Sequence, residues 1–476
     1  MLNQKPLKLL SLLLALILML AACGGGGEEP DAAETDTGDT AADTEDTAAD
    51  DEAMDDETTD DAAMEDLVGG DSILERADAG EFSGTTVEMF GAFVDEDARR
   101  FEDSVAAFEE RTGIDIQYEG SGDFETLIQV RVEGGDPPDI GGHPQPGLVE
   151  GLVAQGAVID PSEFLGMDFL ERQYAQGWID DSMLGGQIAG VWYRGNIKSL
   201  VWYPKDEFEL AGYEIPTTWD ELLALSDQIV ADGSVPWCIG IESSGATGWP
   251  ATDWIEDIML RTQPPETYDA WTSGELPFDS PEVRNAIETM AEIWMNEDYV
   301  LGGTIGIVTT PFGDAPTPMF DEPPSCWLHR QASFIPAFFP EGAVIGENVD
   351  FFYFPMIDEA YGEPVLTAGD IAVMYNDRPE VRAVMAYLAT GESMKGWVEA
   401  GGFISPHQDS SLDWYPSEVD RRFAEILLGA EVTRFDGSDL MPAAVGAGAF
   451  WTEITDWVTG KSLDEALPAI DAAWPR

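Results

Sequence analysis

Strands and helices are predicted to alternate along the first part of the folded sequence, and this order restricts the possible folds more than any other feature. Residues 85–93 and 114–120 have the composition of buried strands, residues 95–113 have the spacing of an amphipathic helix, and a second helix precedes the short strand 138–140. Alternation of this kind predicts a parallel sheet with right-handed crossovers. Ligands bind at the carboxyl ends of the strands in such sheets, so the loops that follow these strands are candidate sites.

The same alternation recurs after residue 199 and predicts a second lobe, with a chain that crosses between the lobes more than once. Residues 199–233 predict a strand, a short helix and a longer helix that Thr217 or Thr218 caps, with Glu221 as the capping-box acid. Further helices are predicted at residues 254–261, 281–295 and 379–390, and strands at residues 349–357 and after residue 368. The chain is therefore predicted to have an α/β fold.

The beginning of the chain has the pattern of an export signal. Lys5 and Lys8 precede an apolar run, residues 9–20, which is too short to span a bilayer comfortably. The sequence LAAC ends this run at Cys23, and the whole stretch resembles a bacterial lipoprotein signal peptide. The resemblance implies a signal peptide over residues 1–22 and a lipid-bearing Cys23 that anchors the protein to the cell membrane. The alternatives are an ordinary secretory signal with a chance cysteine and an uncleaved anchor.

An acidic segment of low complexity follows the signal. Residues 23–80 consist largely of Asp, Glu, Thr and Ala, and no Lys or Arg lies between Cys23 and Arg76. Such a segment buries too little apolar surface to fold, so we expect a disordered linker; the alternative is calcium binding. The whole chain has 93 acidic and 22 basic residues, a formal net charge of −71. This charge argues against nucleic acid or an anionic membrane surface as a partner.

Cysteine and histidine are scarce in this chain. Besides Cys23 it has only Cys238 and Cys326, and a pair of cysteines in an exported protein is most simply a disulfide. The alternative is two free buried thiols. The sequence has three His and no CxxC motif, so we expect neither a metal site nor a cofactor.

The order of several motifs resembles that of one protein family. The motifs are EGGDPPDI at residues 133–140, the segment 199–222, and GGFISP at residues 401–406. Together they resemble the extracellular solute-binding proteins of ABC transporters, of the carbohydrate-binding type. Residues 236–262 and 325–335 resemble more closely the α-glucoside-binding lipoproteins of that family, in which the two cysteines pair. Residues 329–334 depart from the Gly-Ser-Trp turn of many members.

The resemblance, which extends from about residue 85 to the end, implies a fold and a function. The expected fold of residues 81–476 is the two-lobe periplasmic-binding-protein-like fold, each lobe a mostly parallel sheet flanked by helices, with hinge strands between them. Lobe 1 is expected at about residues 84–195 with a later return segment, and lobe 2 at about residues 200–476. Hinge closure is expected to capture α-glucosides such as trehalose, sucrose or maltose for a membrane permease. The protein is expected to be an extracytoplasmic, lipid-anchored monomer.

Candidate ligand-binding residues follow from the chemistry of sugars. Aromatic rings stack on the apolar faces of a sugar, and planar polar groups pair with its hydroxyls. In lobe 1 the candidates are Phe93, Asp95, His143 and Gln145, and in lobe 2 they are Trp249, Asp253, Trp254, Arg330, Gly369 and Asp370. Turn chemistry is the alternative for Asp95 and His143, and a place in the core is the alternative for Trp254. Core or hinge positions are expected for Trp192, Tyr193, Trp202 and Trp237, and packing for Trp451, with ligand contact as its alternative.

The sequence favours a binding protein over an enzyme. It contains no nucleophile elbow, metal signature, phosphate loop or dinucleotide fingerprint. A glycosidase needs two carboxylates at a set separation, and a chain with 93 acidic residues leaves that alternative open. The other alternative is a binding protein for a non-sugar solute such as a peptide or a polyamine.

Overall fold

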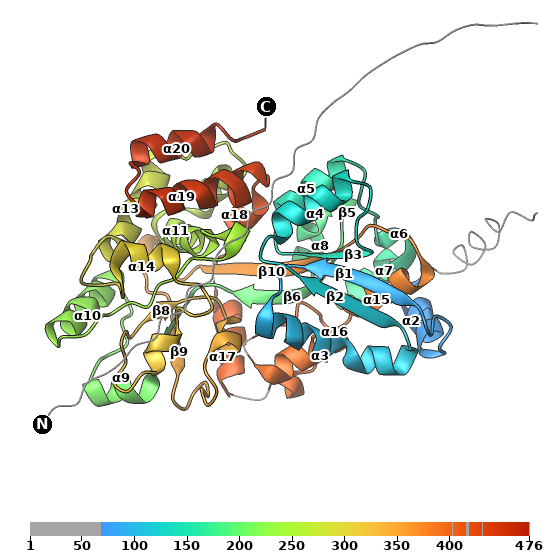
Figure 1. Ribbon diagram of the computed structural model, residues 1–476, viewed down its shortest axis with the longest axis horizontal. Helices are drawn as coiled ribbons and strands as arrows, with labels where there is room; N and C mark the ends of the chain where they lie inside the picture. The colour runs from blue at the N-terminus through green and yellow to red at the C-terminus, as the bar shows by residue number, and fades with distance from the viewer. Residues whose placement is uncertain (1–67, 402, 416–417, 431, 476) are drawn as a thin grey trace, which may run out of the picture. The chain divides into compact units, whose positions relative to one another are not determined.

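The structure is a computed structural model that describes residues 68–401, 403–415, 418–430 and 432–475 (Figure 1). These residues belong to one compact unit, Asp56–Arg476. The predicted signal peptide, Cys23 and most of the predicted linker lie outside the described residues. Among the described residues, no helix is both long enough and apolar enough to span a bilayer.

The first sheet has six strands and contains the predicted strand–helix alternation. Its strands are β1 (Thr86–Gly91), β2 (Asp115–Gly120), β3 (Ile140–His143), β6 (Val191–Ile197), β10 (Val365–Met374) and β11 (Thr433–Phe435). β1 pairs in parallel with β2 and β3, and β10 pairs in parallel with β11. β10 runs antiparallel to both β3 and β6. The sheet is therefore mixed, with the predicted parallel strands on one side of β10.

Helices pack around this sheet. They are α2 (Gly70–Asp78), α3 (Asp95–Thr112), α4 (Phe124–Glu133), α5 (Pro146–Ala154), α6 (Ser162–Leu165), α7 (Met167–Gln173), α8 (Gln176–Asp181), α15 (Pro379–Leu388) and α16 (Gly391–Ala400). A small hairpin, β4 (Met183–Leu184) with β5 (Gln187–Ile188), also belongs here. In α3, Phe101, Val105 and Phe108 are buried in the same hydrophobic cluster as the strands, as an amphipathic helix requires.

The second sheet differs from the prediction. It contains β7 (Leu200–Tyr203) between β8 (His329–Arg330) and β9 (Asp350–Tyr353), and both pairings are antiparallel. The expectation of a mostly parallel sheet in each lobe is therefore wrong for this sheet. The reason is that β7 is fully buried, and a buried apolar run has the same sequence pattern in either orientation.

Most of the later helices surround the second sheet or follow β11. They are α9 (Lys205–Ala211), α10 (Trp219–Ala231), α11 (Trp249–Thr262), α12 (Pro265–Thr272), α13 (Pro281–Trp294), α14 (Gly303–Thr309), α17 (Glu418–Gly429), α18 (Gly437–Leu440), α19 (Trp451–Val458) and α20 (Leu463–Asp471), with the 3₁₀ turns η1 (Ser244–Ala246) and η3 (Ile335–Phe338). The predicted cap of α10 is confirmed, because Thr218 and Glu221 form a reciprocal capping box.

The chain passes from the first sheet to the second and back, as predicted. Lys198 and Ser199 connect β6 to β7, and the segment after β9 leads into β10. Ser199 ties these two connections together: its carbonyl accepts from the Phe354 amide at 2.9 Å and its hydroxyl accepts from the Leu366 amide at 2.9 Å. The α/β fold is confirmed, whereas the lobe boundaries stay a prediction.

The predicted end of the acidic linker lies too late in the chain. α2 begins at Gly70, and its Ile73 and Ala77 are buried in the first hydrophobic cluster. The helix packs against α15. A single Ile and an Ala at helical spacing give too weak a pattern to stand out from the preceding Ala-rich acidic sequence.

Candidate functional site

A cavity lies between the first sheet and the segments around the second sheet. It encloses about 860 Å³ of space, part of it open to solvent. Its aromatic lining consists of Phe93, Trp249, Phe312, Phe334, Phe338 and Trp451. Its charged and amide side chains are Asp97, Glu125, Gln145, Arg194, Asn196, Lys198, Asp370 and Asp439. Rings and planar polar groups are the two components that a sugar site requires.

Strand β6 and its extension supply three polar side chains to one wall. Arg194, Asn196 and Lys198 occupy every second position, so their side chains leave the same face of the strand. All three are buried, at 6%, 7% and 5% exposure. Polar groups this deep require partners, and two of the three have them.

Arg194 of β6 connects strand β10 with helix α3. Its Nε donates to Asp370 Oδ2 at 2.6 Å and its Nη1 donates to Asp97 Oδ2 at 3.0 Å. The guanidinium carbon lies 3.9 Å from the centroid of the Phe93 ring. Burial alone would lower the pKa of Arg194, but the carboxylates of Asp370 and Asp97 raise it above its ordinary range. The group is therefore a fixed cation whose position its partners determine.

Lys198 organises the second charged group. Its ammonium donates to Asp253 at 2.8 Å and to Asp436, and lies 5.3 Å from the centroid of the Trp249 ring. Burial alone would lower the pKa of Lys198, but Asp253 and Asp436 raise it well above its ordinary range. Ligand atoms of Asp253, Glu256 and Asp436 lie within 4.8 Å of one another and could hold a cation. The Lys198 ammonium already bonds to two of these three carboxyls.

Helix α11 carries the rest of this group on one face. Asp253, Glu256, Asp257 and Arg261 recur at helical spacing and are fully buried. The Glu256 carboxylate accepts from the backbone amides of Gly437 and Ser438, both at 2.9 Å, and so holds the start of α18. None of these four α11 side chains lines the cavity, whereas Asp439 of α18, the helix that Glu256 holds, does. The polar face of α11 therefore forms a network behind the cavity wall.

Half of the predicted ligand-binding residues line the cavity. These are Phe93, Gln145, Trp249, Gly369 and Asp370. Trp249 is partly exposed and packs against Phe312 at 5.2 Å and Phe334 at 6.0 Å between ring centroids. It is the first residue of α11 rather than part of a loop, so this helix begins earlier than predicted.

Trp254, a predicted ligand-binding residue, lies in the core and not in the cavity lining. It is 2% exposed and packs within the core against Trp237 at 5.1 Å, Phe354 at 5.5 Å and Trp294 at 5.9 Å between centroids. The physical reason is the earlier start of α11, which places Trp254 past the first turn on the face toward Trp237 and α13. Trp237 is fully buried, as predicted.

Four further predicted residues lie outside the lining of the cavity. Asp95 is exposed at the start of α3. His143 is fully buried and bonds to the Tyr375 hydroxyl at 2.6 Å, and burial lowers its pKa to about 3, which favours the neutral imidazole. Asp253 belongs to the Lys198 group, and Arg330 donates to the Asp253 carbonyl at 2.9 Å and to Asp257 at 2.8 Å. Asp253 and Arg330 therefore support the wall from behind.

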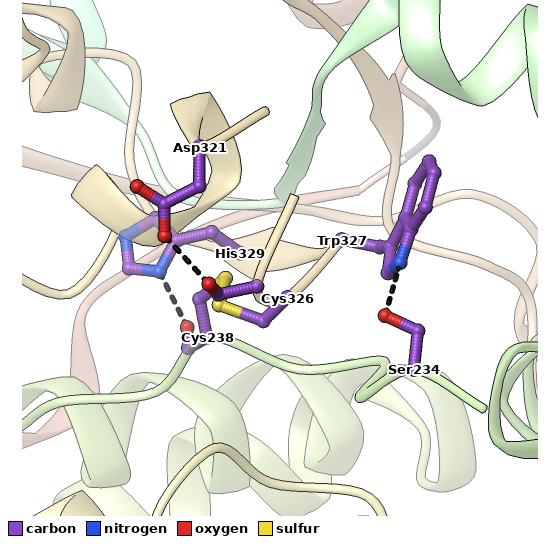
Figure 2. The surroundings of a disulfide bond; sticks show 7 residues. Ser234, Cys238, Asp321, Cys326, Trp327 and His329 are labelled. Atoms are coloured by element: carbon purple, nitrogen blue, oxygen red, sulfur yellow. Dashed lines mark hydrogen bonds between the residues drawn. A yellow bond between two sulfur atoms is a disulfide. The ribbon is translucent and has the colours of Figure 1, made fainter. Parts of the chain in front are cut away.

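The predicted disulfide is confirmed. Cys238 and Cys326 are bonded, are 88 positions apart in sequence, and are both buried (Figure 2). His329 Nδ1 lies 2.8 Å from the Cys238 carbonyl, and Trp327 donates to Ser234 at 2.8 Å. Because β8 begins at His329, three positions after Cys326, the disulfide holds the strand that carries Arg330.

One contact joins the two sides of the cavity at its edge. The Gly245 amide of η1 donates to the Asp123 carboxylate, which precedes α4, at 2.9 Å. Phe334, from the segment after β8, also packs against the hydrophobic cluster of the first sheet. The side of the cavity formed by the first sheet and the side formed by the segments around the second sheet are therefore in contact.

Sequence reasoning missed several lining residues. The alternation of Arg194, Asn196 and Lys198 along an otherwise buried strand was a usable signal, because polar residues at every second position mark one face. The polar spacing on α11 was a second signal. Phe312, Phe334 and Phe338 had none, since isolated phenylalanines between turns have no periodicity.

Comparisons with known proteins agree with this architecture. Residues 95–395 match the family model of bacterial extracellular solute-binding proteins. The osmoprotective compounds-binding protein GgtB of Synechocystis sp. is 45% identical over 390 residues, which cover 82% of this chain and 92% of GgtB. The alpha-glucosides-binding periplasmic protein AglE of Rhizobium meliloti is 43% identical over 403 residues, 83% of this chain and 88% of AglE.

Solved structures share the fold at low identity. The bacterial solute receptor AcbH superimposes with a TM-score of 0.70 at 17% identity, and the maltose-bound MalE3 of T. maritima with 0.64 at 16% identity. In both cases 82% of this chain and 98% of the other are covered. Because the family model spans more than half of the chain and two relatives cover four fifths of it, the chain belongs to the bacterial extracellular solute-binding proteins, a family that acts outside the cytoplasm.

Proposed function

We propose that this protein is the substrate-binding lipoprotein of a sugar ABC importer, and that it captures α-glucosides and delivers them to a membrane permease. One observation carries the proposal: aromatic rings and planar polar side chains line a single cavity between the two sheets. The rings, Trp249 above all, stack on the sugar, and the polar groups pair with its hydroxyls. The AglE relative, named for α-glucosides, supports the choice of ligand.

Capture proceeds by hinge closure. The connections around Ser199 are the hinge, and the contact between Gly245 and Asp123 belongs to the closed state. A ligand that touches both sides of the cavity favours the closed state by its differential affinity for it. The permease then recognises the closed form.

The cavity binds its ligand without converting it. The relatives GgtB and AglE are named for binding their compounds and not for a reaction on them, which supports this part of the proposal. The protein is further proposed to act as a monomer that the lipid on Cys23 anchors to the membrane. Replacing Cys23 by Ser is expected to release the protein from the membrane fraction, and its retention there would contradict the anchor.

A second candidate ligand class follows from the GgtB relative, which is named for osmoprotective compounds. Such compounds include sugars and small zwitterions, so the two relatives lead to different expectations for a non-sugar solute. The acidic excess of the cavity wall favours neutral or cationic solutes over anionic ones.

Titration calorimetry of the purified full chain tests the proposal. The panel contains trehalose, sucrose, maltose, glucose and glycine betaine, and the sugar is recovered afterwards and analysed by chromatography. The proposal requires binding of at least one α-glucoside and its recovery intact. Binding of glycine betaine alone favours the second candidate, and hydrolysis of a sugar overturns the assignment as a binding protein.

A further inference from the structure

One acid of the cavity wall has a carboxyl that pairs with no other described residue. Asp439 of α18 is 5% exposed and lines the cavity. Its backbone amide donates to Asp436 at 3.0 Å, but its carboxyl has neither a hydrogen bond nor an ion pair within the described part of the chain. The buried acids around it differ: Asp97 and Asp370 bond to Arg194, and Asp253 and Asp436 bond to Lys198.

The local charges explain why Asp439 stays unpaired. Arg194 and Lys198 are the basic residues that line the described cavity, and each is already shared by two carboxylates. Asp439 lies within electrostatic range of both groups, since Asp436, Lys198, Asp253 and Asp370 all act on its carboxyl. Burial, with a contribution from the neighbouring Asp436, raises its pKa well above the ordinary value. Asp439 is therefore an acid without a cation of its own. In the neighbouring Arg194 and Lys198 groups, two carboxylates already share each cation.

A buried polar group without a partner costs folding free energy, so its place in a cavity wall calls for a ligand. A second group on the wall has the same property. Asn196 of β6 is 7% exposed and lines the cavity, and its Oδ1 has no hydrogen-bond partner among the described residues. Both groups can accept hydrogen bonds, and sugar hydroxyls can donate them.

We propose that Asp439 is a specificity-determining residue that accepts hydrogen bonds from ligand hydroxyls, together with Asn196, and that selects neutral sugars against sugars bearing a phosphate or carboxylate. This inference rests on the proposed function and names the chemical subclass of its ligand. Hydroxyl donors of a neutral sugar favour the ionised form of the Asp439 carboxyl, whereas the phosphate or carboxylate of an anionic sugar would add a negative charge beside it. A neutral sugar supplies the missing donors instead.

The test compares Asp439→Asn with Asp350→Asn in the full chain. Asp350 of β9 is also a buried acid, at 8% exposure, but it pairs with Arg422 of α17 and does not line the cavity. Each protein is titrated with trehalose and with trehalose 6-phosphate, and its thermal midpoint is measured without ligand. The wild type is expected to bind trehalose and to discriminate against the phosphate.

Asp439→Asn is expected to bind trehalose about 10- to 100-fold more weakly, the range for losing hydrogen bonds to a charged group. Its preference for trehalose over the phosphate is expected to shrink, and its thermal midpoint without ligand to stay the same or to rise. Asp350→Asn is expected to keep the wild-type affinity and preference. Unchanged affinity in Asp439→Asn overturns the inference, and so does a fall in its midpoint that accounts for the weaker binding.

The design separates this inference from the proposed function. If the wild type binds none of the α-glucosides but binds another solute of the panel, the proposed function fails. The same two variants are then titrated with that solute. A loss confined to Asp439→Asn supports Asp439 as the residue that selects the ligand, and equal affinity in wild type and variant overturns it.

Discussion

The guanidinium carbon of Arg194 lies 3.9 Å from the centroid of the Phe93 ring, and the same guanidinium bonds to Asp97 and Asp370. One side chain of β6 thus packs against an aromatic ring of the cavity wall and pairs with two buried acids. The position of Phe93, one of the predicted ligand contacts, depends on this group.

Replacing Arg194 by Gln is expected to destabilise the protein by about 3–5 kcal/mol, because Asp97 and Asp370 would remain buried without a cation. Urea unfolding of wild type and variant measures the difference. Arg172→Gln is the matched control, since Arg172 is 53% exposed and pairs with an exposed Asp71. The control is expected to lose less than about 1 kcal/mol. Equal effects in both variants would contradict the role assigned to Arg194.

The two tryptophans of α11 are expected to separate binding from stability. Trp249→Ala removes a ring from the cavity lining and is expected to weaken sugar binding, with a smaller effect on folding. Trp254→Ala empties a core position and is expected to cost about 3–5 kcal/mol of stability. Calorimetric affinity and urea unfolding are measured on both. A Trp249→Ala protein that binds sugar as tightly as the wild type would remove Trp249 from the site.

Loss of the disulfide is expected to weaken both folding and binding. The bond closes a segment of 88 positions, for which the chain-entropy model gives about 4–5 kcal/mol of stabilisation. Replacing Cys238 and Cys326 together by Ala and measuring urea unfolding tests this value. Ligand affinity is also expected to fall, because β8 carries Arg330 into the Asp253 and Asp257 group. If affinity is unchanged, the bond does not support the site.

Glu125 is expected to make stability depend on pH. Burial raises the pKa of this cavity residue from 4.5 to about 7, so the folded state binds its proton more tightly than the unfolded state. Its contribution to stability is complete below the unfolded pKa and is lost as pH rises through about 7. Urea unfolding of wild type and Glu125→Gln from about pH 4 to about pH 8 tests this. The variant is expected to lose less stability over that interval, and parallel curves would contradict the assignment.

The sequence was sufficient to predict the parallel strands β1, β2 and β3 with their helices, because each has a clear period and a turn signal at its ends. It was also sufficient for the capping box of α10 and, by family resemblance, for the disulfide. It failed for the orientation of β7, whose buried residues have the same pattern in parallel and antiparallel sheets.

The site was predictable only in part. Phe93, Trp249 and Asp370 follow strands or turns that a sequence can reveal, and they do line the cavity. Trp254 and His143 have equally suitable chemistry but are buried, since residue type alone does not determine which face a side chain occupies. Asp439 was not predicted, because its lack of a partner results from how Arg194 and Lys198 are shared, which only tertiary structure shows.

The most direct test of the account is a crystal structure of the protein grown with trehalose. The account predicts one sugar in the cavity, with a ring stacked on Trp249 and a hydroxyl within hydrogen-bond distance of the Asp439 carboxyl. Density for the sugar at any other place on the protein, with this cavity filled only by water, would contradict it.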